Sequence, residues 1–156
     1  MKENEPDILE VLIRHELVIM ELYELFAGMF PERRDFWAGL ANEERGHADF
    51  LGTLQSREDF REWFESSSRL KPQAVKISIE FVGKQIAWAR ERKFSLIEAL
   101  SLARDLEAAL VERQFGVMAR RAPGEIRVVM EKLAADTERH EKVIDGALNE
   151  EKRRSH

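Results

Sequence analysis

The stretch that decides the fold is residues 40–54, LANEERGHADFLGTL, in which an acid and an imidazole interrupt an apolar pattern. Glu44 and His47 are three positions apart, so on a helix both side chains share one face, one turn apart. The same face carries apolar side chains, at Phe36, Leu40, Leu51 and Leu54. Because an ionised carboxylate is costly to bury alone, Glu44 is expected to be paired, protonated or bound to a metal.

The composition is typical of a soluble helical protein. Of 156 residues, 44% are hydrophobic and 35% are charged, with only four Pro and eight Gly. The net charge of −5 argues against a nucleic-acid partner. The lack of Cys excludes disulfides, thiolate zinc sites, iron–sulfur clusters and cysteine nucleophiles. The first residues lack the apolar core of a signal peptide and no run approaches about 18 apolar residues, so we expect a cytoplasmic protein with no membrane partner.

Apolar residues recur every three or four positions in four long segments. This periodicity predicts four core helices, over residues 7–28, 31–55, 95–120 and 124–149. Ser95 followed by Glu98 is a capping-box signature at the start of the third helix. Residues 56–94 are less regular and are predicted to form a long crossover that contains a helix of its own. Residues 1–156 are therefore predicted to be one all-α domain.

The other core helices also have Glu or His at positions that are predicted to be buried. Glu16 stands in the middle of the apolar stripe of the first helix, and Glu107 holds the same place in the third. His140 lies on the stripe of the last helix. No Lys or Arg is evident on these stripes, so an all-protein network would be hard to neutralise. His15 is adjacent to Glu16 and is therefore expected to point to the surface.

The two halves of the chain echo each other. Residues 15–23, HELVIMELY, parallel residues 106–114, LEAALVERQ, and the Leu-Ala pair that precedes His47 is matched by one that precedes His140. A repeat of one helical hairpin about a pseudo-twofold axis would bring five ligands to one depth: Glu16, Glu44, His47, Glu107 and His140. Oxygen and imidazole ligands without sulfur suit iron or manganese, with zinc as a further alternative.

A Glu in one helix, Glu-x-x-His in the next, and the repetition of this pattern across a crossover resemble the ferritin-like di-iron carboxylate proteins. The short hairpin loops and the spacing from Glu16 to Tyr23 are most similar to the erythrin domain of rubrerythrins. The resemblance implies a ferritin-like four-helix bundle of two helical hairpins joined by the crossover. It also implies these metal ligands: Glu16, Glu44, His47, Glu107 and His140.

The resemblance further implies a non-haem protein with one or two iron ions that reduces peroxide or dioxygen. Rubrerythrins carry a cysteine-ligated electron-transfer module, which this chain lacks, so a separate electron donor is expected. A homodimer is expected by the same analogy. The alternative is a four-helix metal-binding or interaction domain without catalysis, and the sequence leaves enzymatic activity open.

One position departs from the family pattern and keeps that alternative open. The counterpart of Glu44 in the second half is Thr137, a poor metal ligand. Asp136 and Glu138 flank it but point about 100° away on an ideal helix. Whether either one replaces the missing acid is open. Gln114 on the third stripe is expected to hydrogen-bond a ligand carboxylate.

Overall fold

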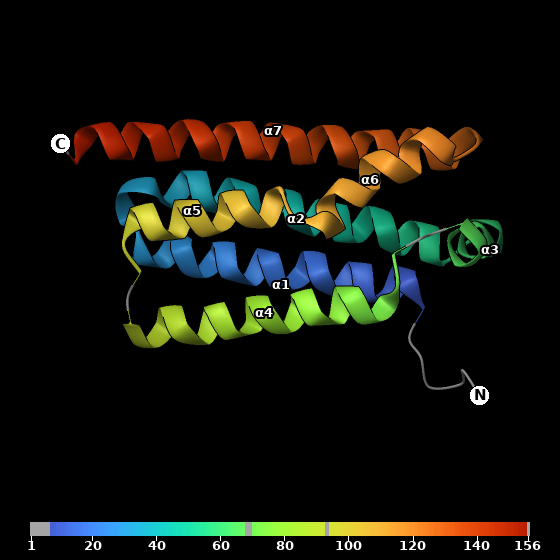
Figure 1. The fold of residues 1–156 in the computed structure, drawn as a ribbon, viewed down its shortest axis with the longest axis horizontal. Coiled ribbons are helices and arrows are strands. Elements are labelled where there is room, and N and C mark those ends of the chain that lie inside the picture. The colour runs from blue at the N-terminus through green and yellow to red at the C-terminus, as the bar shows by residue number, and fades with distance from the viewer. Residues whose placement is uncertain (1–6, 68–69, 93, 156) are drawn as a thin grey trace. The chain divides into compact units, whose positions relative to one another are not determined.

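The computed structural model describes residues 7–67, 70–92 and 94–155, and within these ranges the regular structure is entirely helical (Figure 1). This confirms the predicted all-α class. The chain divides after Glu91 into two compact units. The single domain over residues 1–156 therefore stays a prediction, and each unit is described in turn.

The first unit is built on a helical hairpin. Its elements are α1 (Ile8–Met29), the short 3-10 helix η1 (Pro31–Arg33), α2 (Arg34–Gln55), α3 (Glu58–Ser67) and α4 (Pro72–Arg92). Asp7 caps α1, and its side chain accepts a 2.7 Å hydrogen bond from the backbone N–H of Glu10. Pro31 follows the end of α1 and begins η1, so the chain turns sharply into α2.

An aromatic cluster holds the loop end of the α1–α2 hairpin together. Trp37 is fully buried, and its ring centroid lies 5.6 Å from that of Tyr23 and 4.9 Å from that of Phe26. Phe36 makes an edge contact with the same indole at 5.2 Å. These contacts fix the register of α1 against α2, because offset and edge-to-face pairs are directional.

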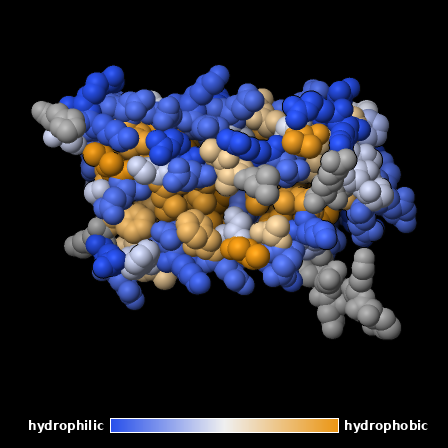
Figure 2. Space-filling view, viewed as in Figure 1, coloured by the Kyte–Doolittle hydropathy of each residue, from blue (hydrophilic) through white to orange (hydrophobic). Residues whose placement is uncertain are grey.

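Helix α4 covers a second side of α1. Its inward face buries Val75, Val82, Ile86 and Ala89. Ser78 contributes its hydroxyl to a 2.7 Å hydrogen bond with His15 Nε2 of α1. The outward face carries exposed Ile77, Phe81 and Trp88. Figure 2 shows hydrophobic as well as hydrophilic residues on the face viewed, as expected for helices that bury only one stripe.

The second unit consists of α5 (Leu96–Glu107), α6 (Leu110–Arg121) and α7 (Gly124–Arg154), with α7 packed against both of the others. The predicted helix over residues 95–120 is wrong, because it breaks after Glu107. Ala109 has an extended backbone, with φ −70° and ψ 162°. The break changes the phase of α6, which then buries Val111, Phe115 and Met118. Ala is the best helix former, so packing and not local propensity decides the break.

The ends of α5 and α7 follow local rules. Glu98 N–H donates to Ser95 Oγ at 3.1 Å, and Ser95 N–H donates to Glu98 Oε1 at 3.0 Å, so the predicted capping box is confirmed. Gly124 opens α7 with φ +47°, a conformation that favours glycine. Helix α7 continues past the predicted end at residue 149 to Arg154. None of the described helices is long and apolar enough to cross a membrane.

Candidate metal centre

Three of the predicted ligands come together inside the first unit. Glu16 comes from α1, and Glu44 and His47 come from successive turns of α2. The relative exposures of the three are 0%, 1% and 2%. Each offers a ligand atom, and these three atoms lie within 4.8 Å of one another. This group is called the α1–α2 triad below.

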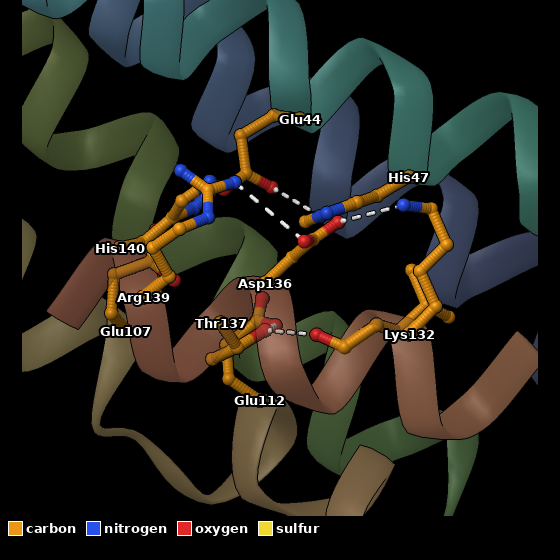
Figure 3. Close-up of polar contacts among 10 residues, drawn as sticks. Glu44, His47, Glu107, Glu112, Lys132, Asp136, Thr137, Arg139 and His140 are labelled. Carbon is orange, nitrogen blue, oxygen red and sulfur yellow. Dashed lines mark hydrogen bonds and ion pairs between the residues drawn. The ribbon is translucent and has the colours of Figure 1, made fainter.

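The α1–α2 hairpin places the triad because the two helices share one apolar interface. Leu12 and Ile19 of α1 lie on either side of Glu16 and are fully buried, and Leu51 of α2 lies one turn beyond His47 and is fully buried as well. Within α2, His47 Nδ1 lies 3.6 Å from Glu44 Oε2 (Figure 3). The apolar walls exclude water, so charge inside the triad is poorly solvated.

The donor set of the triad fits a divalent transition-metal ion. Two carboxylates and one imidazole supply oxygen and nitrogen ligands, which suit iron, manganese or zinc. A protonated His47 could balance only one of the two carboxylates. The second must be protonated, hydrogen-bonded or matched by a cation, because an ionised carboxylate is unfavourable in a dry site.

The second unit holds the other two predicted ligands as a pair. Glu107 is the last residue of α5, and His140 lies in the middle of α7. Glu107 Oε1 and His140 Nδ1 are 3.4 Å apart, and both side chains are almost completely buried. Three of the five predicted ligands therefore belong to the first unit and two to the second. The convergence of all five at one depth stays a prediction.

The acids on either side of Thr137 are not buried. Asp136 Oδ1 lies 3.6 Å from Arg139, and Asp136 Oδ2 lies 3.9 Å from Lys132, so the carboxylate is turned toward cations of its own helix (Figure 3). Glu138 is exposed. The side chains of Asp136 and Glu138 on α7 therefore agree with the expectation that both point away from the face that carries Thr137.

The sequence reasoning missed a buried acid, Glu112 of α6. Its exposure is 2%, and its Oε2 lies 3.4 Å from the hydroxyl of Thr137 (Figure 3). On a continuous helix Gln114 was expected to follow Glu107 on the inner face, but Gln114 is only half-buried. The break at Ala108–Ala109 exchanges the two positions. Only the burial pattern after the break could have shown this.

The expectation for His15 was also wrong. Its exposure is 1%, and it bonds the hydroxyl of Ser78. The expectation assumed that α1 has one buried face, directed at α2. Because α4 covers a second face, the residue next to Glu16 is buried as well.

Comparison with protein-family models, with curated proteins and with solved structures finds no match for this chain. The inference of function therefore depends on the geometry of the two units and on the sequence pattern.

Proposed function

We propose that this chain is a ferritin-like, rubrerythrin-type metal-binding protein that holds iron through its buried Glu and His side chains. The observation that carries the proposal is the α1–α2 triad, in which Glu16, Glu44 and His47 bring ligand atoms within 4.8 Å of one another in a buried site. Under the proposal Glu107 and His140 are ligands as well. Their 3.4 Å approach in the second unit supports that role.

Under this proposal the chain supplies geometry and a dry environment. Glu44 Oε2 lies 3.6 Å from His47 Nδ1, so the two side chains present their ligand atoms to the same place. The apolar residues around the triad keep bulk water away from the carboxylates. Bound iron would supply the electron transfer that peroxide or dioxygen reduction requires. The electron donor would be a separate molecule, because the chain has no Cys for a rubredoxin-type centre.

The test begins with elemental analysis of protein purified without chelator, followed by anaerobic titration with Fe²⁺ and Mn²⁺. We expect tight binding in the wild type and loss of at least tenfold in affinity for Glu44→Gln, because the amide cannot supply an anionic ligand. Glu43→Gln is the matched control, since it removes the neighbouring acid on α2. A wild type that binds neither ion, or a Glu44→Gln variant with unchanged affinity, would overturn the proposal.

A second function, metal binding without turnover, is favoured by one observation. The α7 position that corresponds to Glu44 is Thr137, which cannot act as a bridging carboxylate. Addition of peroxide to the reduced, iron-loaded protein separates the two functions. Rapid oxidation of the iron, repeated after each addition of reductant, supports the oxidoreductase. Bound iron that peroxide does not oxidise supports the non-catalytic protein.

A further inference from the structure

Helix α4 carries large apolar side chains on its outward side. Ile77, Phe81 and Trp88 are 59%, 46% and 48% exposed. Their spacing of four and seven positions puts them on one face of the helix, and Lys84 continues that line between Phe81 and Trp88. Helical periodicity places the buried residues of α4 on the opposite side. These four residues, Ile77, Phe81, Lys84 and Trp88, are called the α4 stripe below.

The α4 stripe has the spacing by which two helices pack together. Single exposed apolar residues are ordinary, but a line of large ones on one helix face is typical of an interaction surface. Successive members of the stripe are four, three and four positions apart, which is the alternation found along the contact line of paired helices. The stripe is therefore suited to contact with another helix.

The charges of the stripe and its borders indicate which helix fits it. Up to the end of the first unit, two basic and two acidic residues lie there: Lys76 and Lys84, and Glu80 and Glu91. Their charges cancel. A helix that binds an anionic membrane needs a cationic polar face, and a strongly acidic or basic protein would be favoured by a face of the opposite sign. A surface with the same mixture of charges suits this face, and a second copy of the chain supplies one.

Two α4 stripes are complementary when they run antiparallel. If Phe81 of one copy is level with Lys84 of the other, the twofold relation also sets Trp88 opposite Ile77. Glu80 of each copy then lies within about 1.5 Å, along the axis, of the level of Lys84 of the other copy, so two ion pairs can form across the contact. The aliphatic stem of each lysine covers a Phe81 ring. A parallel pairing would instead set Glu80 against Glu80 and Lys84 against Lys84.

We propose that the chain forms a homodimer through the α4 stripe, with the two copies of α4 antiparallel. The assignment rests on exposure and charge, and not on the resemblance to rubrerythrins. Three large side chains, each about half exposed, provide roughly 300 Å² of apolar surface per copy. Even with their borders, two stripes bury less than the about 1,200 Å² at which standard protein interfaces begin. We therefore expect a reversible dimer with a Kd in the micromolar range.

Sedimentation-velocity ultracentrifugation of the full chain, over low to high micromolar concentrations, tests the interface. We expect a monomer–dimer equilibrium in the wild type. Phe81→Glu and Ile77→Glu should each raise the Kd by about tenfold or more, because each places an unpaired carboxylate in the contact. The matched control is Val128→Glu, which changes an apolar residue of α7 that is 66% exposed and should leave the Kd unchanged. Far-UV circular dichroism and thermal unfolding establish that each variant is folded.

Exchange of charges tests the antiparallel pairing. Glu80→Lys and Lys84→Glu should each raise the Kd of the homodimer by about three- to tenfold, because each sets like charges opposite one another in two places. A mixture of these two single variants should form a heterodimer, in which opposite charges face again. The double variant Glu80→Lys/Lys84→Glu should recover the wild-type Kd, because the exchange restores both ion pairs.

Three results would overturn the proposal. One is a wild type that stays monomeric at every concentration. Another is a dimer that Phe81→Glu and Ile77→Glu leave intact, because the two copies would then meet through a different face. The third is a double variant that dimerises as weakly as the single ones, which would contradict the antiparallel contact. Sedimentation is measured without added metal, so these results are independent of the proposed metal binding.

Discussion

Glu16 illustrates how a proposed metal ligand opposes the stability of its own helix. It is fully buried between Leu12 and Ile19, where an apolar side chain would pack well. Replacing a buried charged group by a hydrophobic one of similar volume is often neutral or stabilising by about 1–4 kcal/mol. We therefore expect Glu16→Leu to raise the free energy of unfolding of the metal-free protein by about 1–3 kcal/mol, while metal no longer stabilises the variant.

Urea unfolding with and without Mn²⁺ measures both effects. Glu21→Gln is the matched control, since Glu21 lies on the exposed side of α1 in an ion pair with Arg90 at 3.5 Å. That exposed pair should contribute little, within about 0.5 kcal/mol. A Glu16→Leu variant that is clearly less stable without metal would show that Glu16 is a structural acid.

Loss of the His15–Ser78 hydrogen bond is expected to lower the stability of the fold. It joins a buried imidazole of α1 to the half-buried hydroxyl of α4 at 2.7 Å. Ser78→Ala should lower the free energy of unfolding by about 1–2 kcal/mol, because it removes one partner of a hydrogen bond in a dry place. The control is Ser66→Ala at an exposed position of α3, expected within about 0.5 kcal/mol. Equal effects of both substitutions would contradict the structural role of Ser78.

At the level of residues, periodicity found Glu16, Glu44, His47, Glu107 and His140. Each interrupts an apolar stripe, and the structure buries all five. It failed for His15 and Glu112. Both errors have one origin: a stripe assigns a single inner face to a straight, continuous helix. Contact with α4 gives α1 a second buried face. The break before α6 changes which positions of α6 point inward. The residue spacing within a single helix predicts neither effect.

At the level of elements, the capping box of α5 gives a pH-dependent prediction. The hydrogen bonds from the Ser95 backbone N–H and hydroxyl hold the pKa of Glu98 below its ordinary value of 4.5. A lowered folded-state pKa means that ionised Glu98 stabilises the fold fully above that ordinary value, and that this contribution is lost as the pH falls through the folded-state pKa. The stability difference between wild type and Glu98→Gln should therefore be largest near neutral pH and should shrink as the pH falls below that ordinary value.

Urea unfolding at pH 7 and at several acidic values measures this difference. Glu125→Gln is a suitable control, because it removes an acid from the first turn of α7, which has no capping side chain. A difference that stays constant from neutral to acid pH would contradict the role of the ionised carboxylate.

A substitution at Ala109 tests the break between α5 and α6. It should stabilise a chain that breaks here and destabilise one continuous helix over residues 95–120. Ala109 is the N-cap of α6 and makes no side-chain capping bond. Ala109→Ser should therefore stabilise the protein by about 0.5–1 kcal/mol, because a serine hydroxyl at this position can accept from the first turn of α6. In the continuous helix that the sequence predicted, the same change would destabilise by a few tenths of a kcal/mol. Ala108→Ser, one position earlier, is the control.

Helix starts carry local signals that helix interiors lack. Asp7, Ser95, Pro31 and Gly124 act through their own backbone or side-chain chemistry, and the structure places each at a helix start or turn. The break at Ala108–Ala109 has no such signal, because two alanines favour a helix. The break accompanies the burial of Val111 and Phe115 on α6 and the packing of α6 against α7, and such long-range packing leaves no local signal in the sequence.

At the scale of the whole molecule, the question is whether residues 1–156 unfold as the one domain that the sequence predicts. The aromatic residues provide separate probes. The three Trp and the single Tyr all lie before residue 92, so intrinsic Trp fluorescence reports on the first unit. Far-UV circular dichroism reports on the helices of both units. If the chain is a single cooperative domain, the two signals must give the same midpoint.

The same two midpoints can be measured at increasing metal concentration. An ion at 100 times its Kd stabilises the folded state by about 2.7 kcal/mol, which for units of this size raises the midpoint on the order of 10 °C. We expect Mn²⁺ to produce such a saturable rise in the fluorescence midpoint and Glu44→Gln to abolish it, because the triad lies in the unit that fluoresces. We also expect the dichroism midpoint to follow at every Mn²⁺ concentration, since one cooperative domain has one transition. A fluorescence midpoint that rises while part of the dichroism signal keeps its metal-free midpoint would contradict the single domain and leave the triad as a site of the first unit alone.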